Sequence, residues 1–409
     1  MTTFLPSLPL QMSYPLLFGV LLVVGMMGGE LARLARLPRI IGYTVVGFII
    51  APLASAMGIA PLIDEARIFV DLALGLVLFE LGRRMDLRWM RRDWTLAAMG
   101  FAESALTFAA VFFTLRAFAF EPVIAGLAAS IAMTASPAVL LFVVHDTRSE
   151  GQVTSRAFNL VAMNGLLAST VATLMLGSAH LKAQVSIETA ILHPLYLFLG
   201  SLVLGALMAM ASRVVARSVQ RSPDVHFTLI AGMVVTAVGL AVLLRLPVIL
   251  ALLAFGLFAR NDERGHDLLN VSLAPFGRML FIVLFVITGA SLPLQALWEG
   301  FGIVMALVAA RIAGKFLGVV AFARLGELNW RQAAGLGLVL SPMSTLALLM
   351  AHDISKIFAE FRADMLDVFL GAVLVMEIAG PILTQVGLRI SGETLEDPEG
   401  TLAPHRRNA

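Results

Sequence analysis

The chain has 409 residues, of which 59% are hydrophobic and 14% charged, and its mean hydropathy is +0.91. This composition is too apolar for a soluble domain of this size, and the chain is too long to be a single membrane anchor. The net charge of +2 comes without a basic stripe for nucleic acid, and the absence of cysteine excludes disulfides and thiolate metal sites. We therefore predict an all-α polytopic membrane protein.

Apolar stretches of about 20 residues follow one another along nearly the whole chain, each long enough to cross a bilayer as a helix. They predict about thirteen transmembrane helices within residues 1–390, followed by a short polar tail at 391–409. The predicted helices lie near residues 13–35, 39–58, 66–82, 94–117, 121–145, 157–180, 189–218, 225–244, 247–260, 268–290, 300–322, 331–352 and 364–390.

Arginines gather in the connections that follow odd-numbered stretches, such as Arg83, Arg84 and Arg148, and they are sparse in the other connections. By the positive-inside rule this bias places the N-terminus outside the cell and the C-terminus in the cytoplasm. An odd number of spans requires the same arrangement. We expect a multi-pass protein of the inner (plasma) membrane, surrounded by the lipid bilayer.

Two Ser-Pro pairs, Ser136-Pro137 and Ser341-Pro342, interrupt stretches in which an unbroken helix is expected. Proline has no amide hydrogen, and a broken helix survives in lipid only where protein buries it or a wet cavity adjoins it. Three sequence echoes recur in order at an offset of about 205 to 209 residues. They pair Pro38 with Pro247, Phe79 with Phe285 and Pro137 with Pro342.

The offset relates stretches that cross the membrane in opposite directions. This pattern predicts an inverted structural repeat with two broken crossing helices, the arrangement in which secondary transporters place the substrate near mid-membrane. Two ordinary kinks are the alternative, but they do not explain the matched positions. The ends of the broken helices carry partial charges, so the place where they cross needs counter-charges and can coordinate ions.

Five segments stand out in order along the chain: Leu37-Pro38 through Gly47, Leu78-Phe79 through Asp86, Thr134-Ala135-Ser136-Pro137, Arg311-Ile312-Ala313-Gly314-Lys315 and Leu340-Ser341-Pro342. In their order and spacing these segments resemble the monovalent cation:proton antiporter superfamily, particularly the branch of bacterial sodium/proton antiporters and glutathione-gated potassium efflux transporters. The resemblance implies a homodimer with alternating access. It also implies a scaffold at about 13–90 and 225–290, a transport core at about 94–180 and 300–390, and a linker helix at about 189–218.

The chain departs from that family at its ion-binding positions. Asn164-Gly165 stands where the family has an Asn-Asp, Asp-Asp or Gln-Asp pair whose last member, a carboxylate, binds the cation or the proton, and Ser344-Thr345 stands where it often has Gly-Glu. Ser136 occupies a position at which the family can carry Asp. Proton exchange needs a titratable group, so three alternatives stay open: another group titrates, the substrate moves without proton exchange, or the protein does not transport.

Lys315 is the leading candidate for an exchangeable proton, because an ammonium inside a membrane is costly and can release its proton. Its alternative role is a permanent charge beside the carbonyl ends of the broken helices. Arg311 is expected to be a constant structural cation. Glu103 and Glu377 are candidate compensating charges, and either could pair with Lys315 or Arg311. For Glu377 the alternative is a carboxyl that accepts hydrogen bonds near a helix kink.

We therefore expect a secondary transporter that exchanges a monovalent cation, Na⁺ or K⁺, for protons at an atypical site. The alternatives are a carrier or channel-like pathway for another ion or solute on the same fold, and a member that does not transport. No cofactor, resident metal or enzymatic motif is expected. The expected ion- and proton-binding residues are Thr134, Ser136, Asn164, Gly165, Lys315, Ser341, Ser344 and Thr345.

Overall fold

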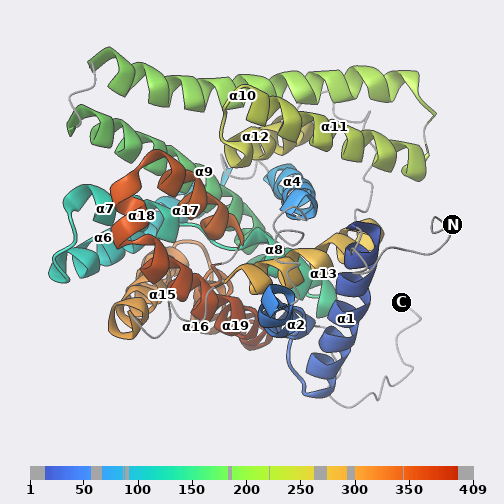
Figure 1. Ribbon diagram of the computed structural model, residues 1–409, viewed down its shortest axis with the longest axis horizontal. Helices are drawn as coiled ribbons and strands as arrows, with labels where there is room; N and C mark the ends of the chain where they lie inside the picture. Colours follow the sequence, from blue (N-terminus) through green and yellow to red (C-terminus); the bar gives the residue numbers. More distant parts are fainter. Residues whose placement is uncertain are drawn as a thin grey trace, which may run out of the picture.

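The computed structural model describes residues 14–56, 67–85, 87, 92–182, 187–220, 222–261, 274–292, 300–343 and 345–394 (Figure 1). Of the expected site residues, Ser344 lies outside the described residues, as does the tail from 395 onward. The first helices are α1 (Tyr14–Leu34), α2 (Arg39–Ala56), α4 (Arg67–Arg84), α6 (Trp94–Ala117), α7 (Pro122–Ala132), α8 (Pro137–Asp146), α9 (Gln152–Lys182) and α10 (Ile187–Ser218). The others are α11 (Pro223–Leu243), α12 (Val248–Asn261), α13 (Ala274–Ser291), α15 (Phe301–Ala323), α16 (Trp330–Val339), α17 (Thr345–Ile357), α18 (Ala359–Asp364) and α19 (Leu366–Ile390).

The predicted all-α polytopic membrane fold is confirmed. Within the described residues, eight helical spans are long and apolar enough to cross a membrane, and three shorter apolar helices accompany them. Each predicted stretch coincides with one helix or with two half-helices. The short helix α18 was not predicted. Helix α9 begins at Gln152, not near 157, because the Glu393 carboxylate accepts hydrogen bonds from the amides of Val153 (2.6 Å) and Thr154 (2.8 Å).

The Ser-Pro pairs break their helices in two different ways. Ser136 is the N-cap of α8, where its hydroxyl accepts a hydrogen bond from the Val139 amide (3.3 Å) and Pro137 occupies the first helical turn. In the second repeat, α16 ends at Val339 and α17 begins at Thr345, so that Pro342 lies in the segment between them. We call residues 132–137 and 340–343 together the crossing.

Helix packing follows the inverted repeat. The backbones of Gly82 on α4 and Gly256 on α12 are in contact, and Gly47 on α2 lies against the backbone of α13 near Gly289. The repeat offset pairs Gly47 with Gly256 and, to within two residues, Gly82 with Gly289. The two contacts therefore occupy equivalent positions in the two repeats. The contact of α7 with α9 and that of α16 with α19 form a second pair of equivalent contacts. Small residues permit these close approaches.

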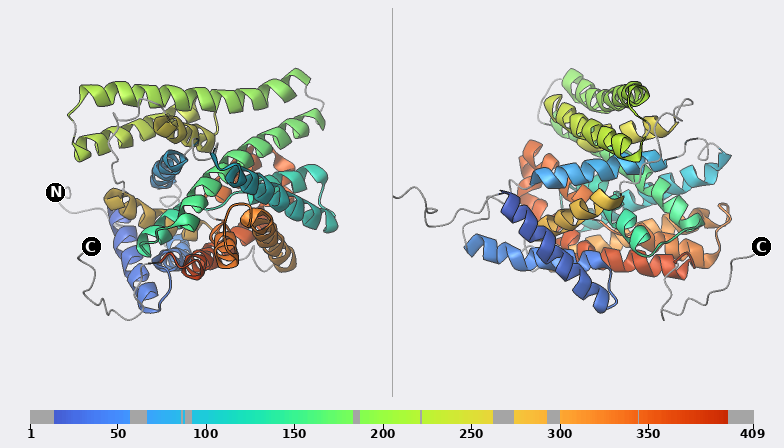
Figure 2. Two further views of the ribbon diagram at one scale, coloured as in Figure 1. Left: turned by 180° about the vertical axis from the view of Figure 1, so that it is seen from behind. Right: turned by 90° about the vertical axis from the view of Figure 1, so that its right-hand side faces the viewer.

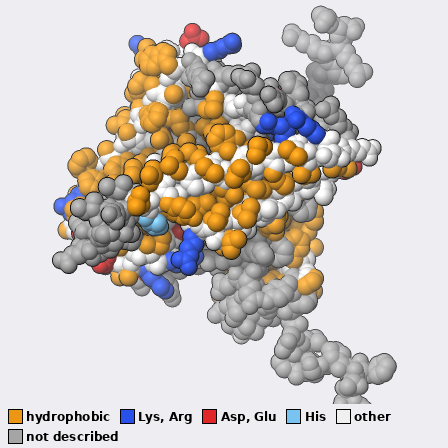
Figure 3. Space-filling view, turned by 90° about the horizontal axis from the view of Figure 1, so that it is seen from above, with side chains coloured by type: hydrophobic (Ala, Val, Ile, Leu, Met, Phe, Trp, Pro, Cys, Tyr) orange, Lys and Arg blue, Asp and Glu red, His pale blue; other side chains and the backbone are white. Residues whose placement is uncertain are grey.

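The crossing lies deep inside the protein. The span from Pro122 to Asp146, which contains α7 and α8, is 89% buried within its most apolar window. In Figure 1, α10 runs along one edge with α11 and α12 beside it, whereas α15, α16 and α19 lie toward the opposite edge; Figure 2 shows the same order from two other directions. Hydrophobic side chains cover the outer face over α10 in Figure 3, among them Leu199, Val203 and Leu207. Such a face suits lipid.

Candidate functional site

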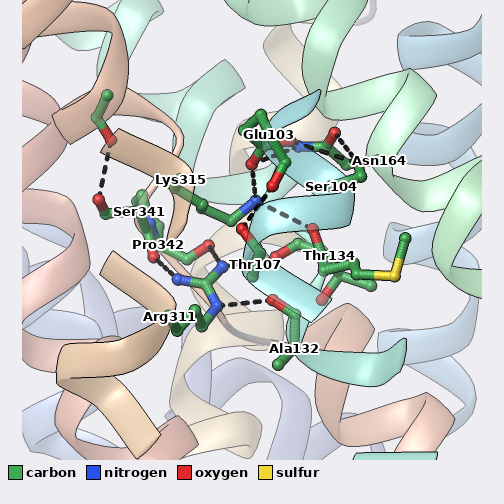
Figure 4. Close-up of polar contacts among 12 residues, drawn as sticks. Glu103, Ser104, Thr107, Ala132, Thr134, Asn164, Arg311, Lys315, Ser341 and Pro342 are labelled. Carbon is green, nitrogen blue, oxygen red and sulfur yellow. Dashed lines mark hydrogen bonds and ion pairs between the residues drawn. The ribbon is translucent and has the colours of Figure 1, made fainter. Parts of the chain in front are cut away.

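The two broken helices are joined directly at the crossing. The Ser136 amide donates a hydrogen bond to the carbonyl of Pro342 (2.9 Å), which links the first break to the second. The last carbonyl oxygens of α7 have no amide donor within that helix, and neither have the last carbonyl oxygens of α16. These oxygens converge on α15, which passes beside both breaks (Figure 4).

Arg311 of α15 fills this position. Its guanidinium is fully buried and donates to the carbonyls of Ala132 (3.0 Å), Thr134 (2.5 Å) and Pro342 (3.1 Å), and also to that of Ser341. A planar fork of five donors suits several acceptors that lie in fixed directions. Arg311 thus satisfies the carbonyl ends of both breaks and brings one positive charge to the negative end of the α7 dipole.

Lys315 lies one helical turn after Arg311 and has a different partner. Its ammonium forms an ion pair with Glu103 of α6, and both side chains are 0% exposed. Lys315 Nζ also donates to the Met133 carbonyl (2.9 Å). The structure therefore brings Glu103, one of the two candidate compensating carboxylates, directly onto the lysine.

Asn164 and Ser104 complete the polar cluster around Glu103. Asn164 Nδ2 donates to Glu103 Oε1 (3.4 Å), and Ser104 Oγ donates to Asn164 Oδ1 (3.1 Å). Ser104 Oγ also lies 3.4 Å from Glu103 Oε2. The amide of Asn164 and the hydroxyl of Ser104 thus gather around the Glu103 carboxylate, while the Lys315 ammonium contacts that carboxylate and the Met133 carbonyl (Figure 4). Oxygen donors of this kind suit hard cations.

Glycines flanking Lys315 bring α15 against α6. A Cβ atom added at Gly318 would lie 2.6 Å from the Glu103 amide nitrogen, and one added at Gly314 would lie 2.8 Å from that of Thr107. Side chains larger than hydrogen would push the helices apart. The Gly-x-x-x-Gly spacing is a sequence signal for close helix contact that our sequence analysis did not use. Ser104 and the Met133 carbonyl were also missed, and no motif marks them.

Other expected site residues lie outside this cluster or bind local backbone. The hydroxyls of Thr134 and Ser341 donate to Ile131 O (2.8 Å) and Gly337 O (2.9 Å). Thr345 Oγ1 lies 3.3 Å from Thr288 Oγ1 of α13. A Cβ added at Gly165 would meet Leu253 Cδ1 at 3.2 Å and Leu346 Cδ2 at 3.8 Å, so this position faces α12 and α17.

Glu377 of α19 is fully buried, and within the described residues neither of its carboxyl oxygens has a hydrogen-bond partner. The structure does not join Glu377 to Lys315 or to Arg311. Of the two candidate carboxylates, only Glu103 belongs to the polar cluster.

A cavity of about 1030 Å³ opens between α1, α2, α4 and α13 on one side and α8 and α9 on the other. Charged residues line it, and Arg39 on α2 reaches across to Asp146 at the end of α8 (3.2 Å). The Arg84 guanidinium of α4 lies 4.2 Å from the centre of the Phe158 ring on α9. These two contacts link the two sides of the cavity.

A sequence comparison identifies the family of the chain. The family model described as sodium/hydrogen exchanger, transmembrane, matches residues 18–388. The chain belongs to the sodium/hydrogen exchanger family. This confirms the predicted resemblance to the monovalent cation:proton antiporter superfamily. No curated protein matches the sequence of this family member.

Solved structures agree on the fold of this exchanger-family chain. The sodium proton antiporter MjNhaP1 of Methanocaldococcus jannaschii at pH 8 is similar to it with a TM-score of 0.62 and 18% identity, over 94% of this chain and 99% of that one. An electron-microscopy structure of the same antiporter gives a TM-score of 0.64 and 17% identity, over 92% and 93%.

Proposed function

We propose that the protein exchanges a monovalent cation, Na⁺ or K⁺, for protons at the crossing, with Glu103 and Lys315 as the exchanging pair. Membership of the sodium/hydrogen exchanger family supports cation/proton antiport. The observation that carries the proposal is the fully buried Glu103–Lys315 ion pair beside Asn164. It supplies a titratable group although Gly165 lacks the carboxylate that the family has there.

The chemistry of the pair follows from charge balance. Without a cation, the Lys315 ammonium neutralises the Glu103 carboxylate. An incoming dehydrated cation takes the ammonium's place, and Lys315 gives up one N–H proton to water and becomes a neutral amine. The net charge of the Glu103–Lys315 pair together with its cation is the same in both states, so cation binding leaves no uncompensated charge within the pair. Cation and proton therefore compete for one position.

Oxygen atoms of the polar cluster around Glu103 and of the adjoining crossing would ligate the cation. They belong to the Glu103 carboxylate, the Asn164 amide, the Ser104 hydroxyl and the Met133 carbonyl. Hydroxyl and carbonyl oxygens keep a free lone pair when they take part in one hydrogen bond. Thr134, Ser136 and Ser341 contribute by holding the breaks in shape.

Arg311 has a supporting role in this scheme. A guanidinium keeps its proton, and its donors are directed at backbone carbonyls of both breaks. Arg311 thereby balances the partial negative charge of the backbone carbonyls at the crossing. Lys315 is then free to change its protonation. The same contacts argue against an anion carrier, because the Arg311 donors are already used and the Lys315 charge is met by Glu103.

Alternating access would come from movement of a core (α6–α9 and α15–α19) against a scaffold (α1, α2, α4 and α11–α13), with α10 as the linker. The charged cavity between α2 and α8 lies at the boundary of these two parts. We place the protein in the plasma membrane with the N-terminus outside and the C-terminus in the cytoplasm. We also propose a homodimer, which the apolar outer faces of the helices would allow.

The test is cation-driven proton movement in proteoliposomes, measured across the alkali cations for the wild type, Lys315→Ala and a double variant. Breaking one partner of a buried pair costs about 3–5 kcal/mol, so Lys315→Ala lowers stability as well as exchange. The double variant Glu103→Gln with Lys315→Met removes both charges together. We expect this double variant to fold, to reconstitute into proteoliposomes like the wild type and to show no cation/proton exchange.

Two results would contradict the proposal. Folded wild-type protein that responds to no alkali cation would exclude antiport, and exchange that persists in the double variant would exclude this pair as its site. Solute flux without proton movement would support instead a carrier of another kind on the same fold.

A further inference from the structure

Glu377 is the one buried carboxyl among the described residues that the proposed exchange does not use and for which no hydrogen bond or ion pair is found. It lies near the midpoint of α19, a 25-residue helix that is also a candidate membrane span. Its residue is 0% exposed, and both carboxyl oxygens lack partners in the part of the chain that the structure describes. Buried polar groups without partners are rare and call for an explanation.

Glu377 lies close to the crossing in depth. Gly380, about one helical turn further along α19, packs directly on the second break, since a Cβ added there would lie 2.9 Å from Pro342 Cβ and 3.1 Å from its Cα. Helix α19 also contacts α15 and α8, which carry the charges and the first break of the crossing. The carboxyl is thus at mid-membrane beside the site but outside its hydrogen-bond network.

Within the described residues, no charged group on the neighbouring helices is paired with Glu377. Arg311 and Lys315 of α15 bond to the crossing and to Glu103, and Arg39 of α2 pairs with Asp146 of α8. The other titratable or charged residues on helices in contact with α19 are Tyr43 on α2, His145 on α8, Arg331 on α16, His352, Asp353 and Lys356 on α17, and Glu360, Arg362 and Asp364 on α18. Within the described residues, none of them forms an ion pair with Glu377.

An ionised carboxylate without a partner is strongly disfavoured in the membrane interior, so the buried carboxyl in this conformation holds a proton. A purely structural carboxylic acid would use its O–H as a donor and its carbonyl as an acceptor, and Glu377 does neither toward any residue that the structure describes. An apolar side chain of similar size would pack as well without the cost of burying polar atoms. The ability to bind a proton is therefore what distinguishes Glu377 from an apolar side chain at this position.

We propose that Glu377 binds and releases a second proton in the transport cycle, in addition to the proton that Lys315 exchanges. The inference rests on the proposed function and sets its stoichiometry at two protons for each cation. When the core opens Glu377 to water on one side, its O–H bond breaks and the proton passes to that water. The cation-loaded core then carries the Glu377 carboxylate to the other side. Once the cation is released there, the carboxylate and the Lys315 amine each take a proton from water, and the core returns with both protons. One net charge crosses in each cycle.

The first test measures charge and protons moved per cation in proteoliposomes. Wild-type exchange is expected to be electrogenic, with two protons per cation. Glu377→Gln keeps the size of the side chain but cannot titrate, so exchange should continue with half as many protons per cation and no net current. Glu377→Asp should restore the current. Asp367→Asn, which removes an exposed carboxylate from the same helix, is the matched control and should behave like the wild type.

Unchanged stoichiometry in Glu377→Gln would overturn the inference, because a permanently neutral structural acid predicts that result. A second readout on the purified protein needs no transport. Infrared difference spectra between acid and alkaline buffer should contain a protonated-carboxyl band that Glu377→Gln loses, Glu377→Asp shifts and Asp367→Asn retains.

A wild-type spectrum without a titrating band of this kind would also overturn the inference. If the band titrates while wild-type protein exchanges no cation, the proposed antiport fails and so does the assignment of Glu377 to its cycle. The two failures are thus distinguishable. Loss of all exchange would contradict the proposed antiport, whereas a wild-type cycle with one proton per cation would contradict only the second proton carried by Glu377.

Discussion

Arg311 and Lys315 show how two cations one turn apart on the same helix acquire different roles. The guanidinium reaches four backbone carbonyls, which are fixed acceptors without a protonation change. The ammonium contacts a carboxylate and one carbonyl. Since a guanidinium keeps its proton and an ammonium can release it, only Lys315 can take part in proton exchange.

Gly165 offers a prediction at the position of the missing family carboxylate. In Gly165→Asp the new side chain begins between Leu253 and Leu346, where a carboxylate without a cation would be poorly solvated. We expect lower thermal stability in cation-free buffer and a larger stabilisation by Na⁺ or K⁺ than in the wild type. Gly165→Asn, which has the same size without the charge, is the control. Equal cation responses of the two variants would contradict this view.

Asp93 gives a pH dependence at the edge of the membrane part. Burial opposes its ionisation, but the Thr95 hydroxyl and the Arg156 guanidinium, 2.9 Å away, together hold the pKa of Asp93 below its usual value. A depressed folded-state pKa stabilises the fold above the unfolded value, about 3.9, and this contribution disappears as pH falls through the lower folded value.

We therefore expect Asp93→Asn to lower the free energy of unfolding by about 1.5–3 kcal/mol at neutral pH, the usual value of a hydrogen bond to a charged group. The difference between variant and wild type should shrink as the solution is acidified below about pH 4. Thermal unfolding in detergent at several pH values checks this. If the difference in the free energy of unfolding between Asp93→Asn and the wild type stays constant with pH, the charge of Asp93 does not contribute to stability.

At the scale of elements, the pairing of α6 with α15 positions the exchanging groups. Gly318→Ala would place a methyl group against the Glu103 backbone and separate the helices, at a cost of about 1–3 kcal/mol for overpacking. We expect lower stability together with loss of exchange, because Lys315 then no longer reaches Glu103. Gly302→Ala on the same helix, where nothing lies within 4 Å, should change neither. Exchange at wild-type rates in Gly318→Ala would contradict the account.

The helices themselves could be predicted from the sequence, because apolar length decides where a chain crosses lipid. Their ends and partners could not. The first turn of α9 depends on Glu393, 240 residues from Val153, and no local pattern announces such a cap. The broken helices were predicted because proline acts locally. Lys315 was identified as a site residue, but whether Glu103 or Glu377 would be its partner depended on how α6, α15 and α19 pack.

At the scale of the whole molecule, the inverted repeat brings the two broken helices together at the crossing, and the charged cavity lies between α2 and α8. Arg39 and Asp146 join α2 to α8 across this cavity, with 34% and 24% of their side chains exposed. Such a partly exposed pair contributes at most about 1 kcal/mol. It would form and break as the core moves against the scaffold.

Asp146→Asn should therefore shift the balance between the conformations without removing the exchange chemistry. We expect the apparent cation affinity to change by no more than about fivefold, which corresponds to about 1 kcal/mol, while the protons moved per cation stay the same. The charge exchange Arg39→Asp with Asp146→Arg should return the affinity toward the wild-type value. Transport kinetics at several cation concentrations measure this, and a changed stoichiometry would contradict a purely conformational role.

Cation-triggered proton release tests the central claim most directly. Purified protein in weakly buffered detergent solution is mixed with NaCl or KCl, choline chloride serves as the control salt, and a pH dye reports the protons released. The account predicts that the transported cation releases protons from the wild type. The double variant Glu103→Gln with Lys315→Met should not show this cation-triggered release. Cation binding without proton release, or equal release from the double variant, would contradict an exchange at the Glu103–Lys315 pair.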